Sequence, residues 1–322
     1  MTTTIGIDVS KATLDVMIVQ DQTRNHRQFA NTRQGHQQLQ RWLQQQGAEQ
    51  GQVCLEATGR YGQALTRLLY DQAIPVSVVN PRRIKAYGES LLQRNKTDKS
   101  DAWLIADFCR TQQPRLWQPP DPATETLQAW QRRLDDLQQM RTQEINRLEA
   151  LPKSDVVYPG IRRHLRILEH EIGQVEQAIA THIQTSPSIQ QAHDLLTSIV
   201  GIGDKSAGQI LAELPDIHTF DNAAELAAYA GVSPRQKRSG SSVRGRSRLV
   251  KIGSAKLRKA LFFPALAAMR FNPHLKRVAD RLLAAGKPKM VVVGAIMRKL
   301  LCLIYAILKS GRPYDPNYQF PT

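Results

Sequence analysis

The stretch Ile5-Gly6-Ile7-Asp8-Val9-Ser10 near the start of the chain is typical of a short apolar β-strand that ends in an acid. Two further strands are expected at residues 14–19 and 27–31, and the same type of apolar run recurs at residues 53–57 and 76–79. Helical spacing is found at residues 35–46 and again after Gly59. Three strands in succession, followed by helices that alternate with strands, predict an α/β domain of the ribonuclease H-like type with Asp8 on the central strand.

A second group of acids opens the helix predicted within Asn95-Lys96-Thr97-Asp98-Lys99-Ser100-Asp101-Ala102. Asp98 and Asp101 are three residues apart, so they lie on the same side of the first turn, where two like charges repel. A hard divalent cation such as Mg²⁺, or Mn²⁺ in its place, relieves that repulsion. In a ribonuclease H-like sheet, Asp8 and Glu56 would end neighbouring strands, so four carboxylates from three elements would converge on one metal cluster. The simpler alternatives are an acidic turn that complements the helix dipole, a turn cap at Asp8 and a helix cap at Glu56.

The composition indicates a soluble globular protein that binds a polyanion. The chain has 322 residues, 41% of them hydrophobic and 22% charged, which is enough for two domains and argues against disorder. Its formal net charge of +16 and its pI near 10.0 favour nucleic acid as the partner.

Cysteine usage and the chain ends favour a cytoplasmic protein. Cys54, Cys109 and Cys302 are too scattered for a disulfide framework or a zinc site, so a reducing compartment is expected. The first residues lack the pattern of a secretory signal. The apolar run at residues 290–308 carries Arg298 and Lys299 in its middle, which is costly at the centre of a bilayer, so we expect a core helix and no membrane partner.

The chain is expected to divide into residues 1–117, 118–186 and 187–322, and the middle part has the texture of a long helical pair. Apolar residues recur there at intervals of three and four amid Gln, Arg and Glu, with breaks at Pro152 and Pro159-Gly160. This spacing predicts a coiled-coil arm used for oligomer contacts, with a simple two-helix spacer as the alternative.

A helix-hairpin-helix is predicted around Ile199-Val200-Gly201-Ile202-Gly203-Asp204-Lys205. Gly201 and Gly203 would let backbone N–H groups approach a phosphate at a helix N-terminus, with Lys205 nearby. An ordinary helical turn is the alternative.

The stretch from Pro234 to Arg248 is dense in Arg, Lys, Ser and Gly, and no Asp or Glu occurs between Glu225 and Asp280. Apolar helices are expected on both sides, at residues 257–269 and 291–308, so we predict an ordered loop that cradles phosphates, and a disordered basic linker is the alternative. A serine hydroxyl among arginines could also attack phosphorus, because the arginines would offset the developing charge. Solvent-exposed charge is the alternative for the arginines. The expected nucleic-acid-binding residues are Gly201, Gly203, Lys205, Arg235, Lys237, Arg238, Ser241, Ser242, Arg244, Arg246, Arg248 and Lys251.

Taken together, these motifs resemble the DEDD transposases of insertion-sequence family one hundred and ten, relatives of the Piv DNA invertases. The resemblance is carried in order by Ile5-Gly6-Ile7-Asp8, Cys54-Leu55-Glu56-Ala57-Thr58-Gly59, the Asp98 and Asp101 motif, Gly201-Ile202-Gly203 and Ser239-Gly240-Ser241-Ser242-Val243-Arg244-Gly245. It covers essentially the whole chain. One departure is Val200, which stands where the hairpin motif commonly carries proline.

The resemblance implies a RuvC-like N-terminal domain, a coiled-coil dimerisation arm and a C-terminal transposase domain. It also implies that Asp8, Glu56, Asp98 and Asp101 bind the metal, that Ser239 is the nucleophile, and that the protein is bacterial and associates with the nucleoid when it acts. The implied partners are target and donor double-stranded DNA, a structured noncoding guide RNA (a bridge RNA) and further copies of the chain in a dimer or tetramer. The active site could then be composite.

Three other functions fit parts of the sequence. A RuvC-type junction nuclease would use the four acids and water, with no covalent intermediate. A sugar kinase or actin-like ATPase would share the first strand, but its later glycine-rich loops are missing. A non-catalytic RNA- or DNA-binding protein would have no use for four aligned acids.

Overall fold

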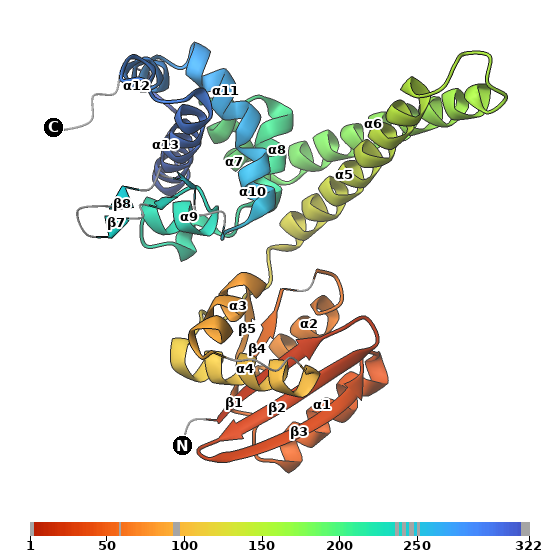
Figure 1. Ribbon diagram of the computed structural model, residues 1–322, viewed down its shortest axis with the longest axis vertical. Helices are drawn as coiled ribbons and strands as arrows, with labels where there is room; N and C mark the ends of the chain where they lie inside the picture. The colour runs from red at the N-terminus through yellow and green to blue at the C-terminus, as the bar shows by residue number, and fades with distance from the viewer. Residues whose placement is uncertain are drawn as a thin grey trace. The chain divides into compact units, whose positions relative to one another are not determined.

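The computed structural model describes residues 3–57, 59–92, 97–235, 238–239, 243–244, 248–249 and 252–316. The chain divides into two compact units, residues 1–119 and 120–322. The first is a mixed α/β sheet with helices and the second is mainly helical (Figure 1). The predicted class, α/β followed by α, is confirmed at this level.

Five strands form the sheet of the first unit in the order β3-β2-β1-β4-β5. The first three strands are antiparallel neighbours joined by short turns, and β4 and β5 run parallel to β1 after helical crossovers. The first strand is therefore central, as predicted, and this topology is compatible with a ribonuclease H-like domain. The strands are β1 (Thr3–Val9), β2 (Thr13–Gln20), β3 (Thr23–Ala30), β4 (Gln52–Glu56) and β5 (Val76–Val79).

Helices cover both faces of this sheet (Figure 1). α1 (Arg33–Gln45) and α2 (Gln63–Asp71) pack on the face that carries Ile5 and Ile7. α3 (Pro81–Ser90) and α4 (Asp98–Gln112) pack on the opposite face, against Cys54 and Met17. Helix α3 was not predicted from the sequence, although Asn80 accepts a hydrogen bond from the Arg82 amide and Pro81 occupies the first helical position, which together are a helix-start signal.

The second unit begins with two long helices, α5 (Pro122–Glu149) and α6 (Tyr158–Thr185). They pack against each other along their length and extend away from the rest of this unit (Figure 1). Their shared core includes Leu127, Leu137 and Val175. The predicted helical pair is therefore present. Its break spans residues 150–157 and includes Pro152, whereas Pro159 and Gly160, also expected in the break, lie in the first turn of α6.

The remaining helices of the second unit surround one apolar core. α13 contacts α7, α9, α11 and α12 and contributes the fully buried Leu300, Leu301 and Ile304. These helices are α7 (Pro187–Thr197), α8 (Asp204–Glu213), a short 3-10 helix (Ile217–Thr219), α9 (Ala223–Tyr229), α10 (Ala255–Ala260), α11 (Phe262–Phe271), α12 (Pro273–Ala284) and α13 (Lys289–Ser310).

Two details differ from the sequence expectation. The helix expected at residues 257–269 is broken at Leu261 into α10 and α11, because Pro264 lacks the N–H that a continuous helix would donate to Ala260. α12 was not expected at all. Within the described residues, α13 is the one helix that is long and apolar enough to cross a membrane. Half of its apolar stretch is buried inside the protein, as expected for a core helix.

Candidate active site

Helix α4 lies directly over the central strand of the sheet, and Gly6 makes this contact possible. A side chain at Gly6 would collide with the backbone of Ala102 and Ala106 in α4. Near the other end of α4, the Cys109 thiol lies 3.6 Å from the carbonyl oxygen of Gln52, where β4 begins. The helix therefore runs opposite to β1 and β4, and its first turn points toward the ends of these strands.

Asp8 and Glu56 occupy those strand ends. The parallel register pairs Ile7 with Leu55, and Asp8 and Glu56 are the next residues along each strand. Because side chains alternate in a strand, Asp8 shares the face of Gly6, which is the face that α4 covers. Asp8 lies about 7 Å along the strand from Gly6. Asp98 lies about 6 Å along the helix from Ala102, in the same direction.

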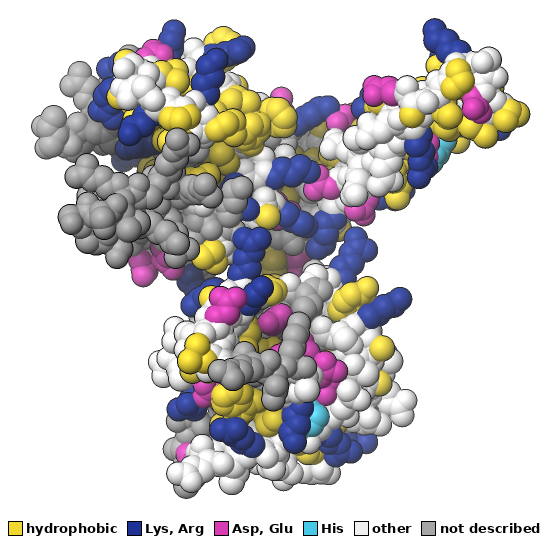
Figure 2. Space-filling model, viewed as in Figure 1, with side chains coloured by type: hydrophobic (Ala, Val, Ile, Leu, Met, Phe, Trp, Pro, Cys, Tyr) yellow, Lys and Arg dark blue, Asp and Glu magenta, His cyan; other side chains and the backbone are white. Residues whose placement is uncertain are grey.

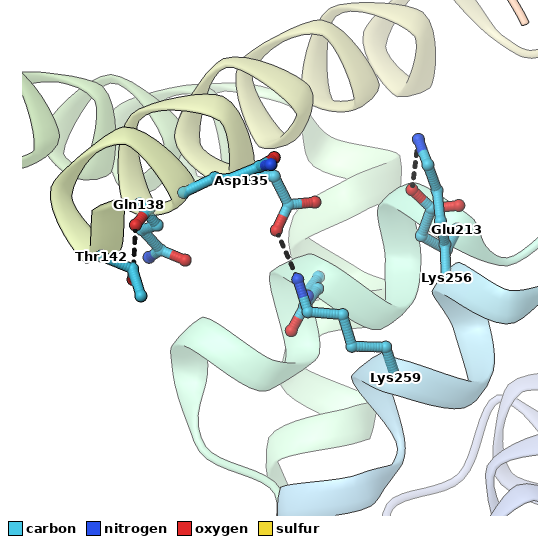
Figure 3. A pocket seen from close by; sticks show the side chains of 8 residues that line it. Asp135, Gln138, Thr142, Glu213, Lys256 and Lys259 are labelled. Atoms are coloured by element: carbon cyan, nitrogen blue, oxygen red, sulfur yellow. Dashed lines mark hydrogen bonds and ion pairs between the residues drawn. The ribbon is translucent and has the colours of Figure 1, made fainter. Parts of the chain in front are cut away.

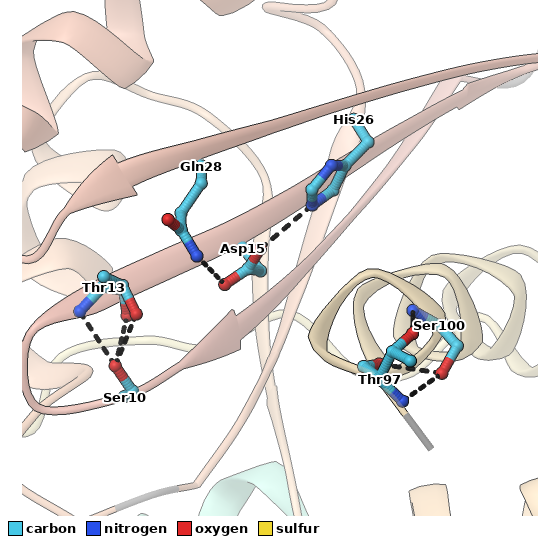
Figure 4. A network of polar contacts seen from close by, with 7 residues as sticks. All are labelled: Ser10, Thr13, Asp15, His26, Gln28, Thr97 and Ser100. Carbon is cyan, nitrogen blue, oxygen red and sulfur yellow. Dashed lines mark hydrogen bonds and ion pairs between the residues drawn. The ribbon is translucent and has the colours of Figure 1, made fainter. Parts of the chain in front are cut away.

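The first turn of α4 is fixed by a capping box. The Thr97 hydroxyl accepts a hydrogen bond from the Ser100 amide at 3.1 Å, and the Ser100 hydroxyl accepts one from the Thr97 amide at 2.8 Å (Figure 4). Asp98 is exposed and Asp101 is half-buried in this turn. Their charges complement the helix dipole, so the simpler interpretation of these two acids also fits.

The topology thus brings the four predicted acids to one end of the first unit, but not into a closed cluster. Asp8, Glu56 and Asp101 are all half-buried. Among the residues that the structure describes, no three His, Cys, Asp or Glu side chains gather closely enough to hold a metal ion.

Asp15 is a fifth carboxylate on this face, and it was not among the predicted site residues. It lies opposite Asp8 in the antiparallel register and is only 5% exposed. His26 lies 3.0 Å and the Gln28 amide nitrogen 2.9 Å from its two oxygens, so both contacts come from the edge strand β3 (Figure 4). The available signal was an acid inside an otherwise buried apolar strand, which costs free energy unless it is paired.

The two buried cysteines nearby are structural. Cys54 lies in β4 beneath α4, and its hydrogen bond with Cys109, reinforced by burial, raises the pKa of the Cys54 thiol far above its ordinary value. Cys54 is therefore held as a protonated thiol within the apolar contact between β4 and α4.

Ser239 lies in a β-ribbon of the second unit. β7 (Arg238–Ser239) pairs with β8 (Val243–Arg244), and β6 (Pro234–Arg235) pairs with β9 (Arg248–Leu249). Arg238 is opposite Arg244, and Arg235 is opposite Arg248. Ser239 belongs to the second unit, and the four acids belong to the first. The predicted residues Lys237, Ser241, Ser242, Arg246 and Lys251 lie outside the described residues.

The predicted phosphate-binding turn joins α7 to α8. Gly201 has a φ of +111°, and a side chain there would come within 2.8 Å of the Ala268 backbone in α11, so glycine is required for packing. Gly203 is the N-cap of α8, and the space beside it is open. Lys205 forms a 2.7 Å ion pair with Glu176 of α6.

A cavity of about 490 Å³ lies between α5, α8 and α10 in the second unit (Figure 3). Its lysines already have acidic partners: Lys259 lies 3.0 Å from Asp135, and Lys256 lies 3.7 Å from Glu213. Burial raises the pKa of the Glu213 carboxyl. This cavity is therefore electrostatically balanced.

Comparison with known proteins identifies the family. Residues 5–153 match a family described as a transposase of the DEDD type, and residues 193–279 match the family described as "Transposase IS116/IS110/IS902 family". The chain is 34% identical over 316 residues to a pilin gene-inverting protein from Moraxella bovis, covering 97% of this chain and 98% of the relative. It is 28% identical over 260 residues to the transposase for insertion sequence element IS1111A from Coxiella burnetii, covering 72% and 68% of the two chains. The chain therefore belongs to the IS110-type transposase and recombinase family of DNA-acting enzymes.

Proposed function

We propose that this protein cleaves and rejoins DNA strands as the recombinase of an insertion sequence, with Asp8, Glu56, Asp98 and Asp101 as metal ligands and Ser239 as the nucleophile. The single observation that supports the ligand set best is the direction of α4. Because the helix runs opposite to β1 and β4, its acidic first turn and the two acidic strand ends share one end of the first unit.

The donor set suits a hard cation. Four carboxylates without sulfur or imidazole are the ligands expected for Mg²⁺ or Mn²⁺. When bound, the ion would polarise the scissile phosphate as a Lewis acid. The carboxylates would hold that ion at the end of the sheet and so set the position of the phosphate.

Ser239 would supply the covalent step. Its hydroxyl oxygen would form a bond to phosphorus while the bond from phosphorus to the 3′ oxygen breaks, giving a phosphoserine link and a free 3′-hydroxyl. The proton lost by Ser239 balances the one gained by the 3′ oxygen. An exchanged 3′-hydroxyl would reverse the same step, so no nucleotide is consumed. Because Ser239 and the acids belong to different units, the working site would form when DNA joins them, within one subunit or between two.

The β-ribbon around Ser239 supports the binding of a polyanion. Its paired strands carry Arg235, Arg238, Arg244 and Arg248. Residues 187–322 carry 21 Lys and Arg against 8 Asp and Glu, a net charge of +13. Phosphates would offset this excess of positive charge. The excess is large enough for both DNA and the guide RNA that the family resemblance implies.

The α7–α8 turn and the α5–α6 pair have separate proposed roles. The turn would act as a helix-hairpin-helix, with the open space at Gly203 admitting a phosphate to the N-terminus of α8. The α5–α6 pair would act as a coiled-coil arm between copies of the chain. At the far end of this pair, Val156 and Ile167 are exposed, and apolar side chains are visible there in Figure 2.

A second outcome of the same chemistry is inversion of a DNA segment. The relative that matches almost the full chain is named for inverting a pilin gene. Joining strands between two inverted sites would give inversion, whereas joining the two ends of an element would give a circular junction.

The test is a junction assay in cells that carry the gene with its native flanking DNA. We expect wild type to give abutted element ends or an inverted segment, and Asp8→Asn and Ser239→Ala to give neither. The loss should exceed about a hundredfold, since each change removes a reacting or ligating group. The matched controls are Asp21→Asn, an acid in the exposed β2–β3 turn, and Ser233→Ala, just before the ribbon.

Each half of the proposal can fail separately. Normal recombination by Ser239→Ala would make the serine assignment wrong. Nicked DNA without attached protein, lost in Asp8→Asn but not in Ser239→Ala, would instead indicate the RuvC-type nuclease. Normal recombination by Asp8→Asn would remove the metal assignment.

A further inference from the structure

A cavity of about 440 Å³ lies in the first unit at the carboxyl end of β1. We propose that it binds a backbone phosphate of the DNA strand whose scissile phosphate lies at the neighbouring acids; the identity of that strand rests on the proposed function. The cavity is lined by Lys11, Asn31, Thr32, Arg33, His36, Tyr61, Ala64 and Leu68.

The lining has the chemistry of an anion site. Two of its side chains, Lys11 and Arg33, are cationic, four others are polar, and none is acidic. Neither cation forms an ion pair with any residue in the described part of the chain. The cavity between α5, α8 and α10 is the opposite case, because each of its lysines has a carboxylate partner. Two uncompensated cations in one hollow favour an anionic ligand.

The hollow is built before a ligand enters, and Asn31 is the residue that joins its walls. The Asn31 amide nitrogen donates to the carbonyl of Ser10 at 2.8 Å and to that of Tyr61 at 3.0 Å. Its oxygen accepts from His36 at 2.8 Å. One side chain thus ties together the β1–β2 turn, the start of α1 and the loop after β4, which lowers the entropy lost on binding.

The turn that carries Lys11 is fixed in the same way. The Ser10 hydroxyl accepts a hydrogen bond from the backbone N–H of Thr13 at 2.8 Å. The backbone N–H of Asn31 donates a hydrogen bond to the carbonyl of Ala12, also at 2.8 Å. Lys11 is therefore held at the rim while its ammonium stays exposed. The N-terminus of α1, capped by Thr32, adds a partial positive charge on the same side.

The place of the hollow identifies its ligand as part of a polymer. Lys11 follows Asp8 by three residues and lies in the β1–β2 turn, so at most about 10 Å of chain separate them. Nucleotides of one DNA strand follow one another at about 3.4 Å along the axis, so the hollow would hold a phosphate within about three nucleotides of the scissile one. Ala64 and Leu68 form an apolar wall that suits sugar carbons. The carboxyl ends of parallel strands are the usual position of ligand sites in α/β sheets.

The experiment compares DNA binding by the full-length protein and by a Lys11→Ala/Arg33→Ala variant. Fluorescence anisotropy with a labelled duplex containing the element end is recorded at several KCl concentrations. The control is Arg41→Ala/Lys85→Ala, which removes two exposed cations from α1 and α3 and leaves the hollow intact. Equal melting temperatures check that both variants fold.

We expect the slope of log K against log salt to fall by about 0.9 in the Lys11→Ala/Arg33→Ala variant, the amount for one lost phosphate contact, and to stay unchanged in the control. Affinity at low salt should fall at least about fivefold. A scan of single methylphosphonates along one strand should weaken binding by wild type at one position, and this effect should be absent in the pocket variant.

Two results would overturn the proposal. Identical slopes and identical methylphosphonate scans in wild type and pocket variant would show that the hollow does not contact DNA. Binding of Mg-ATP by wild type but not by the pocket variant, with unchanged DNA slopes, would make it a free-nucleotide site. The proposed function is tested separately by the junction assay. If the salt slope and the methylphosphonate scan change as expected while Asp8→Asn recombines normally, the hollow binds DNA but Asp8 is not an essential metal ligand.

Discussion

At the scale of single residues, the first unit contains buried polar groups that hold loops together. Asp15 is held by His26 and Gln28, and His36 is 5% exposed and bonded to Asn31. Burial lowers the pKa of the His36 ring below its ordinary 6.5. These groups are stable where they are because each has a partner.

His36 gives a prediction about pH. The folded protein favours the neutral ring, whereas the unfolded chain takes up a proton as the pH falls through 6.5. The stability linked to His36 is therefore present above that pH and is lost as the pH decreases. We expect the melting temperature to fall between about pH 7.5 and pH 5.5, and His36→Gln to flatten that dependence. His170→Gln, a change at an exposed histidine of α6, should leave the slope unchanged. Equal slopes in wild type and His36→Gln would contradict the prediction.

At the scale of elements, the position of α4 depends on one missing side chain. The Gly6 contact brings helix backbone against strand backbone and sets how far the acidic first turn reaches over the strand ends. The distance from the Gly6 Cβ position to the Ala106 Cα is only 2.9 Å. An added methyl group must push α4 outward, because the atoms that it meets are helix backbone atoms, which cannot change rotamer as a side chain can.

We therefore expect Gly6→Ala to destabilise the first unit by about 1–3 kcal/mol or more. Each kcal/mol should lower its thermal transition by about 4–8 °C, as measured by scanning calorimetry. The control is Gly173→Ala in α6, where a side chain meets open space and helix propensity should stabilise the protein by about 0.5–1 kcal/mol. A transition in Gly6→Ala at the wild-type temperature would show that the close approach is not rigid.

At the scale of the whole molecule, charge and apolar surface are separated along the chain. Residues 187–322 carry a net charge of +13, whereas residues 120–186 carry 8 Lys and Arg against 10 Asp and Glu, a net charge of −2. In that weakly charged segment, Ile167 is 54% and Val156 is 91% exposed. Exposed apolar side chains on a helical pair of low net charge suit contact between copies of the chain better than contact with DNA.

We predict that Ile167→Glu shifts the protein toward a smaller assembly in sedimentation velocity. A charge placed in a packed apolar contact costs several kcal/mol, enough to change the association constant more than a hundredfold. Gln177→Glu adds the same charge at an exposed polar position of α6 and should leave the assembly unchanged. Identical sedimentation of Ile167→Glu and wild type would remove this surface from the subunit contact.

Elements with a local signal could be predicted from the amino-acid sequence. Alternation and apolar runs located the strands of the sheet, spacing by three and four located α5 and α6, and the ordered acids with the serine loop identified the family. The same signals missed α3 and α12, which are short and weakly apolar, and did not detect the break between α10 and α11.

Contacts between residues that are distant in the chain could not be predicted in this way, because they depend on how the elements pack. The acidic first turn of α4 reaches the ends of β1 and β4, and the hollow joins Lys11, Arg33 and Tyr61 from the β1–β2 turn, the start of α1 and the loop after β4. The direction of α4 and the hydrogen bonds of Asn31 place them there, and both depend on contacts between residues far apart in the chain. Periodicity reports which side of an element is buried, because burial repeats with each turn or pleat. It carries no information about which element covers that side, because the hydrophobic effect has no direction.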